Sequence, residues 1–157
     1  MNDFDFLHGS WTVVSRRLKT IFAGSDDWDV YPGTTTCRTL FEGGGNTEEI
    51  RFPARGFRGF TLRLFDVERK EWSIYWANDR TGVLQPPVVG TFADGRGDFY
   101  GDDVHEGRPI KAHYLWSGTA GPSPRWEQEF SADGGKTWES NWVMEFTRAG
   151  TGTFSGA

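Results

Sequence analysis

The sequence predicts an all-β fold, a single antiparallel β-barrel of about ten short strands. Runs of alternating apolar and polar residues recur along the whole chain, with short polar turns between them. No segment keeps apolar residues at helical spacing for more than about one turn. The motif Gly9-Ser10-Trp11 opens the first of these runs, so it marks where the barrel begins.

The residues before this motif form a short apolar segment, Phe4 to His8. We expect this segment to fold as one helical turn, a short N-terminal helical plug in one end of the barrel. Gly9 allows the chain to enter the first strand sharply. Trp11 should then pack directly beneath the plug.

Ten candidate strands follow in order: residues 10–19, 34–41, 46–52, 57–66, 71–78, 88–92, 97–101, 109–117, 125–131 and 137–148. The turns at 66–70, 93–96 and 132–136 supply Asp or Gly where positive φ is needed, and they indicate antiparallel hairpins. The longer connection, 23–33, is expected to be a loop that can lie across the barrel mouth as a lid. Residues 1–148 then form one barrel domain, and 149–157, mostly Gly, Ala, Ser and Thr, a flexible C-terminal tail.

Alternation with period two assigns the inward face of each strand. On the last run, Trp138, Ser140, Trp142, Met144 and Phe146 share one face, which should point inward. The same rule turns a few polar side chains inward: Glu48, Asn78, Tyr114, Gln128 and Ser140, with Arg17 as a further candidate. A buried polar group without a partner costs on the order of 1–3 kcal/mol, so these groups must bond to each other, to water or to a ligand.

Composition and charge limit the classes of binding partner and the cellular compartment that the protein can have. A net charge of −5 and a pI near 5.2 oppose binding to nucleic acid or to an anionic membrane surface. The single cysteine, Cys37, excludes an intrachain disulfide framework and fits a reducing compartment. The sequence shows neither a signal peptide nor an apolar run long enough to span a membrane, so we expect a cytoplasmic protein. A homodimer is left open.

Six stretches of the sequence carry a family resemblance: 4–11, 41–48, 62–66, 72–76, 90–92 and 126–142. They resemble a large family of uncharacterised bacterial proteins in the calycin (lipocalin-like) superfamily. The resemblance implies a calycin/lipocalin-like antiparallel barrel, in which the basic Arg148 of the last strand meets Trp11 of the first. The ligand mouth should then lie at the opposite rim. Relatives often have an acidic residue where Ser10 stands, and no catalytic residue carries over.

The first functional hypothesis is binding of a small, partly apolar molecule. Sparse polar groups in an aromatic wall are typical of a small-molecule pocket. The predicted ligand-binding residues are Trp76, Asn78, Tyr114, Trp116, Gln128 and Trp142, with Asn78 and Gln128 fixing orientation. No cofactor is expected, because haem-binding calycin barrels of the nitrobindin type use a late-chain histidine and this chain has none after His113.

Two other functions are left open. In an enzyme of isomerase, cyclase or hydrolase type, Glu48 is the candidate general acid or base, its pKa raised by burial and its partner Tyr114 or Arg17. The alternative role for Glu48 is to anchor the turn at 43–46. In the third reading the barrel is filled and binds another protein. No metal site is expected, because the crowded residues 102–106 favour a solvated hairpin loop.

Overall fold

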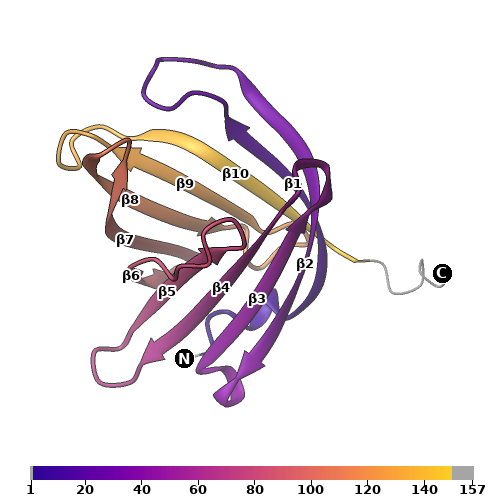
Figure 1. Cartoon of the computed structure of the whole chain (residues 1–157). Coiled ribbons are helices and arrows are strands. Elements are labelled where there is room, and N and C mark those ends of the chain that lie inside the picture. Colours follow the sequence, from indigo (N-terminus) through magenta and orange to yellow (C-terminus); the bar gives the residue numbers. More distant parts are fainter. Residues whose placement is uncertain (1, 150–157) are drawn as a thin grey trace.

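The structure, a computed structural model, describes residues 2–149 and forms a closed barrel of ten antiparallel strands (Figure 1). Each strand pairs with its neighbours in the chain, and β1 pairs with β10 to close the barrel. The strands are β1 (Gly9–Leu18), β2 (Trp28–Leu40), β3 (Gly45–Phe52), β4 (Phe57–Asp66), β5 (Glu71–Asn78), β6 (Val88–Ala93), β7 (Arg96–His105), β8 (Arg108–Ser117), β9 (Arg125–Ser131) and β10 (Glu139–Arg148). The prediction of an all-β barrel of about ten strands is confirmed.

Tight hairpin turns explain the simple up-and-down order. Asp94 and Gly95 join β6 to β7 with φ of 53° and 76°. Glu106 and Gly107 join β7 to β8 with φ of 49° and 78°. Two-residue turns with positive φ at both positions match the right-handed twist of the strands, so they favour antiparallel neighbours.

The N-terminal helical plug is not confirmed. Asp5–Leu7 is only a 3-10 turn of three residues (η1). Its backbone bonds run from Leu7 N to Phe4 O at 2.9 Å and from His8 N to Asp5 O at 3.4 Å, the spacing of a single 3-10 turn. The segment nevertheless buries Phe4 and Leu7 almost completely in the core at this end of the barrel.

The predicted lid at 23–33 is wrong in its second half. β2 begins at Trp28, and Trp28 to Gly33 pair with β1 from Leu18 back to Val13. β3 joins β2 only from Thr34 onward, so this part of β2 extends past the rest of the sheet. The connection that remains is 19–27, where Phe22 N donates to Glu139 Oε1 at 2.7 Å.

Residues 102–106 are also more ordered than expected. Strand β7 continues to His105, so a two-residue turn replaces the predicted solvated loop. Lys111 Nζ donates to Asp102 Oδ1 at 2.5 Å across the β7–β8 pair. Within residues 2–149, no cluster of three or more metal-competent side chains occurs.

The inward assignments of Trp138 and Ser140 are wrong. Ser140 pairs with Glu129, whose side chain lies on the outer face. β10 starts at Glu139, and its register with β9 shifts between Ser140 and Trp142. This irregularity inserts a residue and reverses the parity of what precedes it. Trp138 therefore lies on the outer face, where its ring packs against Tyr100 at 5.9 Å.

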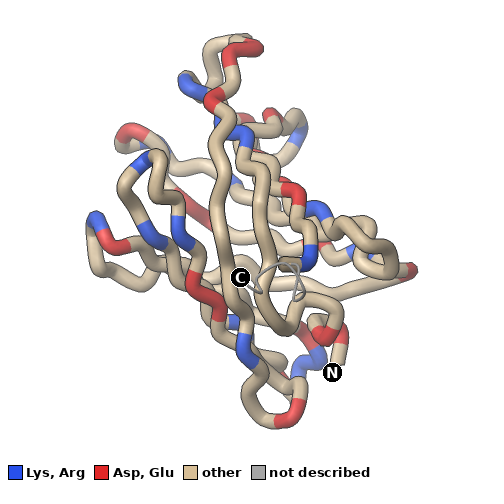
Figure 2. The backbone as a smooth tube through the Cα atoms, turned by 90° about the vertical axis from the view of Figure 1, so that its right-hand side faces the viewer, with Lys and Arg blue, Asp and Glu red and all other residues tan. Residues whose placement is uncertain are grey.

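The outer surface carries both signs of charge. Lys and Arg lie among Asp and Glu along the strands and turns of the side shown in Figure 2. Among the described residues, no helix is long and apolar enough to cross a membrane. The expected tail lies outside the described residues, apart from Ala149, whose N donates to Ser10 O at 3.0 Å.

Candidate functional site

One end of the barrel is closed by the N-terminal segment. The ring of Phe4 packs edge-to-face on Trp72 and on Phe92, each at a centroid distance of 4.9 Å. Trp11 Nε1 donates to Leu7 O at 2.7 Å, so a buried indole here has its partner. None of these residues lines either of the internal spaces described below.

Arg148 seals the same end. Its Cζ lies 3.7 Å from the centroid of the Trp11 ring, close enough for a cation–π contact. Its two terminal nitrogens donate to the carbonyl oxygens of His8 and Phe6. The expectation that Arg148 reaches over Trp11 is therefore confirmed, and this rim is tied to the N-terminal segment.

A pocket of about 200 Å³ opens at the opposite end of the barrel. We call it the mouth pocket. Inward side chains of β5, β8, β9 and β10 form its walls, and a polar rim surrounds it. Its lining includes Trp76, Tyr114 and Trp142 in the wall and Arg17, Asp102 and Asp103 at the rim.

A second space, the inner cavity, lies one layer deeper. It has a volume of about 50 Å³, enough for only a few water molecules at roughly 10–15 Å³ each. It shares Trp76, Tyr114, Gln128 and Trp142 with the mouth pocket, so the two spaces adjoin. Its deeper lining includes Trp116, two residues beyond Tyr114 on the same face of β8.

All six predicted ligand-binding residues line one of these two spaces. Trp76, Tyr114, Gln128 and Trp142 line both, Asn78 lines the mouth pocket, and Trp116 lines the inner cavity. The period-two alternation thus brings together side chains from β5, β8, β9 and β10. Their role in binding a ligand stays a prediction.

Trp142 is the most firmly positioned ring of the mouth pocket. Its Nε1 donates to Ser15 Oγ at 2.9 Å, which fixes the plane of the indole. Arg17 Cζ lies 4.1 Å from the ring centroid on one side. Trp76 stands perpendicular to it at a centroid distance of 6.0 Å. A preformed aromatic corner of this kind loses little conformational entropy when a ligand binds.

Gly59 creates the space that Trp76 occupies. A Cβ at residue 59 would lie 2.0 Å from Trp76 Cη2 and 2.5 Å from Cζ3. Because real Cβ contacts are never so short, any other residue here would displace the indole. Gly59 of β4 is therefore a positioning residue for the mouth pocket that the sequence analysis did not identify.

The polar side chains of the mouth pocket differ in what they can still bind. Asn78 Oδ1 accepts from the backbone N of Arg80 and of Thr81, so only its Nδ2 is left for a ligand. Gln128 Nε2 donates to Asn141 Oδ1 at 2.8 Å. The hydroxyl of Tyr114 has no hydrogen-bond partner within residues 2–149, and burial raises the pKa of its phenol well above the ordinary value.

Glu48 is part of a buried ion pair. Its Oε1 accepts from Arg63 Nη2 at 2.6 Å, and its Oε2 accepts from Thr35 Oγ1 at 2.5 Å. Both side chains of the pair are about 4% exposed. The expected partners of Glu48, Tyr114 or Arg17, are wrong, and so is the expected anchoring of the 43–46 turn by Glu48. Asn46 Oδ1 of that turn accepts from Arg63 Nη1 instead, at 2.8 Å.

Arg63 is the interior residue that the sequence analysis missed. Alternation along β4 groups Thr61 with Arg63 against Leu62, but it does not decide which group points inward. The β4–β5 hairpin decides it, because Arg63 pairs with Ile74 and Thr61 with Trp76. Paired residues share a face, so the register of the turn at 66–70 was the signal that could have revealed Arg63.

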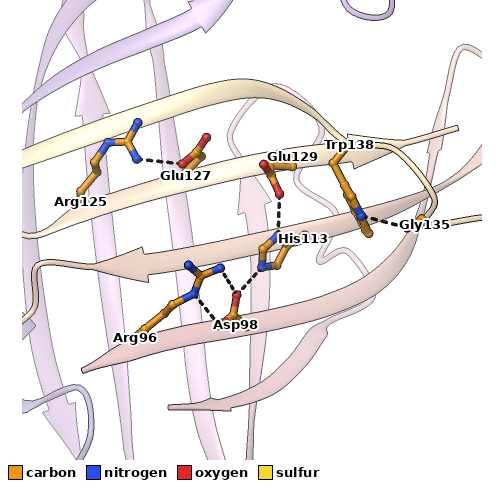
Figure 3. A network of polar contacts seen from close by, with 8 residues as sticks. All are labelled: Arg96, Asp98, His113, Arg125, Glu127, Glu129, Gly135 and Trp138. Carbon is orange, nitrogen blue, oxygen red and sulfur yellow. Dashed lines mark hydrogen bonds and ion pairs between the residues drawn. The ribbon is translucent and has the colours of Figure 1, made fainter. Parts of the chain in front are cut away.

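A second polar cluster lies on the outer face of β7, β8 and β9 (Figure 3). His113, 5% exposed, has its Nε2 2.7 Å from Asp98 Oδ1 and its Nδ1 2.8 Å from Glu129 Oε1. Tyr100 stacks on the imidazole at 4.4 Å. Burial raises the pKa of Asp98, but the hydrogen bonds from Arg96 and His113 together lower it by more. The net effect is a lowered pKa. The cluster lines neither internal space, and the hydrogen bonds of His113 link β8 to β7 and to β9.

The single thiol offers no reactive site. Cys37 is buried, and burial raises its pKa to about 12. A thiol is nucleophilic only as thiolate, which this environment suppresses.

Comparison with known proteins adds no function to these observations, because no protein-family model matches the sequence and no curated protein is significantly similar to it.

Proposed function

We propose that this protein binds a small, partly apolar molecule with one or two rings in the mouth pocket of a calycin-like barrel. The observation that carries the proposal is the pocket itself. It opens at the end of the barrel opposite the seal made by Arg148, and three of its wall residues are Trp76, Tyr114 and Trp142.

The volume of the mouth pocket limits the size of the ligand. Sites for drug-sized molecules have volumes of roughly 300–1,000 Å³, and an apolar cavity of about 150 Å³ holds a benzene ring. A pocket of about 200 Å³ therefore fits one or two rings with small substituents. A long acyl chain would find no continuation, because the inner cavity beyond it is only about 50 Å³.

The rim provides polar contacts for such a ligand. Arg17 is exposed, stacks on Trp142 and makes no ion pair within the described part of the chain. Its guanidinium can donate to a substituent that projects from the mouth.

The single buried thiol supports a reducing compartment, and a cytoplasmic location is part of the proposal.

Acid–base catalysis by Glu48 is less well supported. Both carboxylate oxygens already accept hydrogen bonds, and the residue faces the inner cavity instead of the mouth. A general base must reach the proton that it removes, at roughly 2.6–3.2 Å or through one water molecule. The contacts of Glu48 favour a structural ion pair with Arg63.

Calorimetric titration with 2-naphthol, a two-ring probe, tests the proposal. We expect one binding site in the wild type and at least about tenfold weaker binding in Trp142→Ala, because the variant loses the aromatic corner of the pocket. Trp138→Ala, which removes an indole from the outer face, is the matched control and should bind like the wild type. Near-UV circular dichroism checks that both variants fold. Equal affinity of Trp142→Ala and the wild type would overturn the proposal.

Native mass spectrometry of the purified protein provides a second readout that does not depend on the choice of probe. A ligand retained in the barrel would appear as an added mass. That mass should be lost on denaturation and should be absent from Trp142→Ala. A retained molecule with a mass far above that of a two-ring compound would contradict the size limit set by the pocket.

A further inference from the structure

Two residues that line the inner cavity carry hydrogen-bond donors without a partner. Five buried side-chain atoms lack a hydrogen-bond partner among the described residues, and two of them, Trp116 Nε1 and Arg63 Nε, belong to residues that line this cavity. Trp116 is 1% exposed and Arg63 is 4% exposed. Leaving a buried donor without an acceptor is costly, so each of these two donors calls for an acceptor.

Nε is the one nitrogen of the Arg63 guanidinium that has no partner among the described residues. Nη1 donates to Asn46 Oδ1 at 2.8 Å and Nη2 to Glu48 Oε1 at 2.6 Å. These contacts fix the plane of the group. The remaining Nε–H is thereby held in one direction, which is the condition for a specific contact.

The charge of Arg63 is already balanced. Glu48 pairs with it at 2.6 Å, and no other Asp, Glu, Lys or Arg lines the inner cavity. A carboxylate placed here would add an uncompensated negative charge close to Glu48 in a desolvated space. The chemistry of the cavity therefore favours an acceptor that carries no charge.

The spacing of the two spaces fits a ring with a polar substituent. Tyr114 lines both spaces and Trp116 lies two residues further along β8, which is about 7 Å at roughly 3.4 Å per residue. A ring held at the level of Tyr114 and Trp142 can place an oxygen one layer deeper. A volume of about 50 Å³ fits a carbonyl group but excludes a second ring.

We propose that the inner cavity is the recognition subsite for an uncharged acceptor of the ligand, a carbonyl oxygen or a ring nitrogen, which accepts hydrogen bonds from Trp116 Nε1 and Arg63 Nε. The inference rests on the proposed function, because it assumes that the ring of the ligand occupies the mouth pocket. It adds the polar feature that distinguishes the preferred ligand from other molecules of the same size.

Three probes of nearly equal size test the subsite: acetophenone with a neutral carbonyl, benzoate with an anionic carboxylate, and ethylbenzene with no acceptor. By calorimetry on the full chain, acetophenone should bind about tenfold more tightly than either of the others. If ethylbenzene binds as tightly as acetophenone, water alone serves the two donors and the inference is overturned. Tighter binding of benzoate would overturn the uncharged character of the subsite.

The variant Trp116→Phe keeps an aromatic ring and removes the donor. We expect about tenfold weaker binding of acetophenone and unchanged binding of ethylbenzene. Trp138→Phe is the matched control, since Trp138 lies on the outer face and its Nε1 donates to Gly135 O at 3.1 Å. An equal loss in both variants, or an equal loss for both probes, would show a packing effect and would contradict the inference.

A measurement on the wild type keeps the inference testable if Trp116→Phe does not fold. On addition of acetophenone, the indole N–H resonance of Trp116 should move downfield, as expected when it donates to a carbonyl oxygen, and ethylbenzene should not cause this shift. An unmoved resonance with acetophenone bound would overturn the subsite alone. Failure of all three probes to bind would instead overturn the proposed function, and the subsite with it.

Discussion

The two ends of the barrel use the same kinds of side chain to opposite effect. At the closed end, Trp11 Nε1 has its acceptor in Leu7 O, and Trp72 Nε1 has its acceptor in Asp3 Oδ2 at 2.9 Å. In the inner cavity, between this cluster and the mouth, Trp116 Nε1 is buried without a partner. At the mouth, no hydrogen bond joins the Tyr114 hydroxyl to a described residue. Aromatic content alone therefore does not distinguish a core from a pocket.

The N-terminal segment accounts for much of the difference. Phe4 inserts among Trp72, Phe92, Phe99 and Trp116 at centroid distances between 4.9 and 6.3 Å. Within residues 2–149 the β5–β6 connection borders the mouth with Thr81, Gln85 and Pro86, but it inserts no aromatic ring there, and about 200 Å³ is left. Rings that are packed and hydrogen-bonded stabilise the fold, whereas rings that face a cavity with unpaired donors are available to a ligand.

The largest expected effect comes from emptying the closed end. Phe4→Ala should lower the free energy of unfolding by about 3–5 kcal/mol, because it leaves a cavity in a well-packed cluster. Trp76→Ala at the mouth is the matched change, and it should cost less, about 1–2 kcal/mol, because the ring already borders an open pocket. Urea denaturation monitored by circular dichroism measures both. Equal costs would show that the two ends do not differ in packing.

Substitution of Gly59 should alter the mouth without emptying it. Gly59→Ala forces the indole of Trp76 to move, and we expect a cost of about 1–3 kcal/mol in unfolding free energy together with at least tenfold weaker binding of 2-naphthol. Gly121→Ala is the control, because a Cβ there meets only Gly118 O at 3.7 Å. If Gly59→Ala keeps full affinity, Trp76 is not part of the binding wall.

Removal of the seal at the closed end should affect stability and not binding. Arg148→Ala loses the stack on Trp11 and the bonds to the carbonyls of His8 and Phe6, so we expect a cost of about 1–2 kcal/mol. Arg16→Ala, which removes an exposed pair with Glu145, should cost no more than about 1 kcal/mol. Both variants should bind 2-naphthol like the wild type. Weaker binding in Arg148→Ala would mean that the two ends are coupled.

The sequence predicts the strands well because alternation is a local property. It fails where a feature depends on neighbours in space. The pair Pro32-Gly33 indicates a loop, yet both residues lie in β2. β3 does not reach this part of β2, so no neighbour on that side requires the N–H that Pro32 lacks. Gly33 is also required in the strand, because a Cβ there would lie 2.8 Å from the ring of Phe52.

In the candidate site, too, the sequence predicts the features that are local to one strand and misses those that depend on neighbouring strands. Alternation brings the six predicted side chains to the two spaces, because a constant parity along an unbroken strand fixes a face. It misplaces Trp138, since the irregularity between Ser140 and Trp142 leaves no signal in the sequence. The ion pair of Glu48 with Arg63 depends on the register of two further strand pairs, which a single-strand pattern does not contain.

The smallest expected effect concerns the proton of Tyr114. Burial raises its pKa, so the folded protein keeps the phenol protonated at a pH where the unfolded chain, with a pKa near 10, has lost the proton. This contribution to stability is fully present below about pH 10 and is lost as pH rises toward the folded pKa. The wild type should therefore lose stability above pH 10 more steeply than Tyr114→Phe, in urea denaturation at a series of pH values.

The variant Tyr114→Phe also tests whether the hydroxyl contributes to the fold or to ligand binding at the mouth. Tyr114→Phe removes a hydroxyl that no described residue bonds, so near neutral pH the unfolding free energy should change by less than about 0.5 kcal/mol. A large loss at neutral pH would mean that the hydroxyl has a structural partner, as the indoles of the closed end do. A small loss of unfolding free energy, combined with weaker binding of 2-naphthol, would show that the Tyr114 hydroxyl contacts the ligand and does not stabilise the fold. A hydroxyl kept protonated and unpaired at the wall of a pocket is a donor available to a bound molecule.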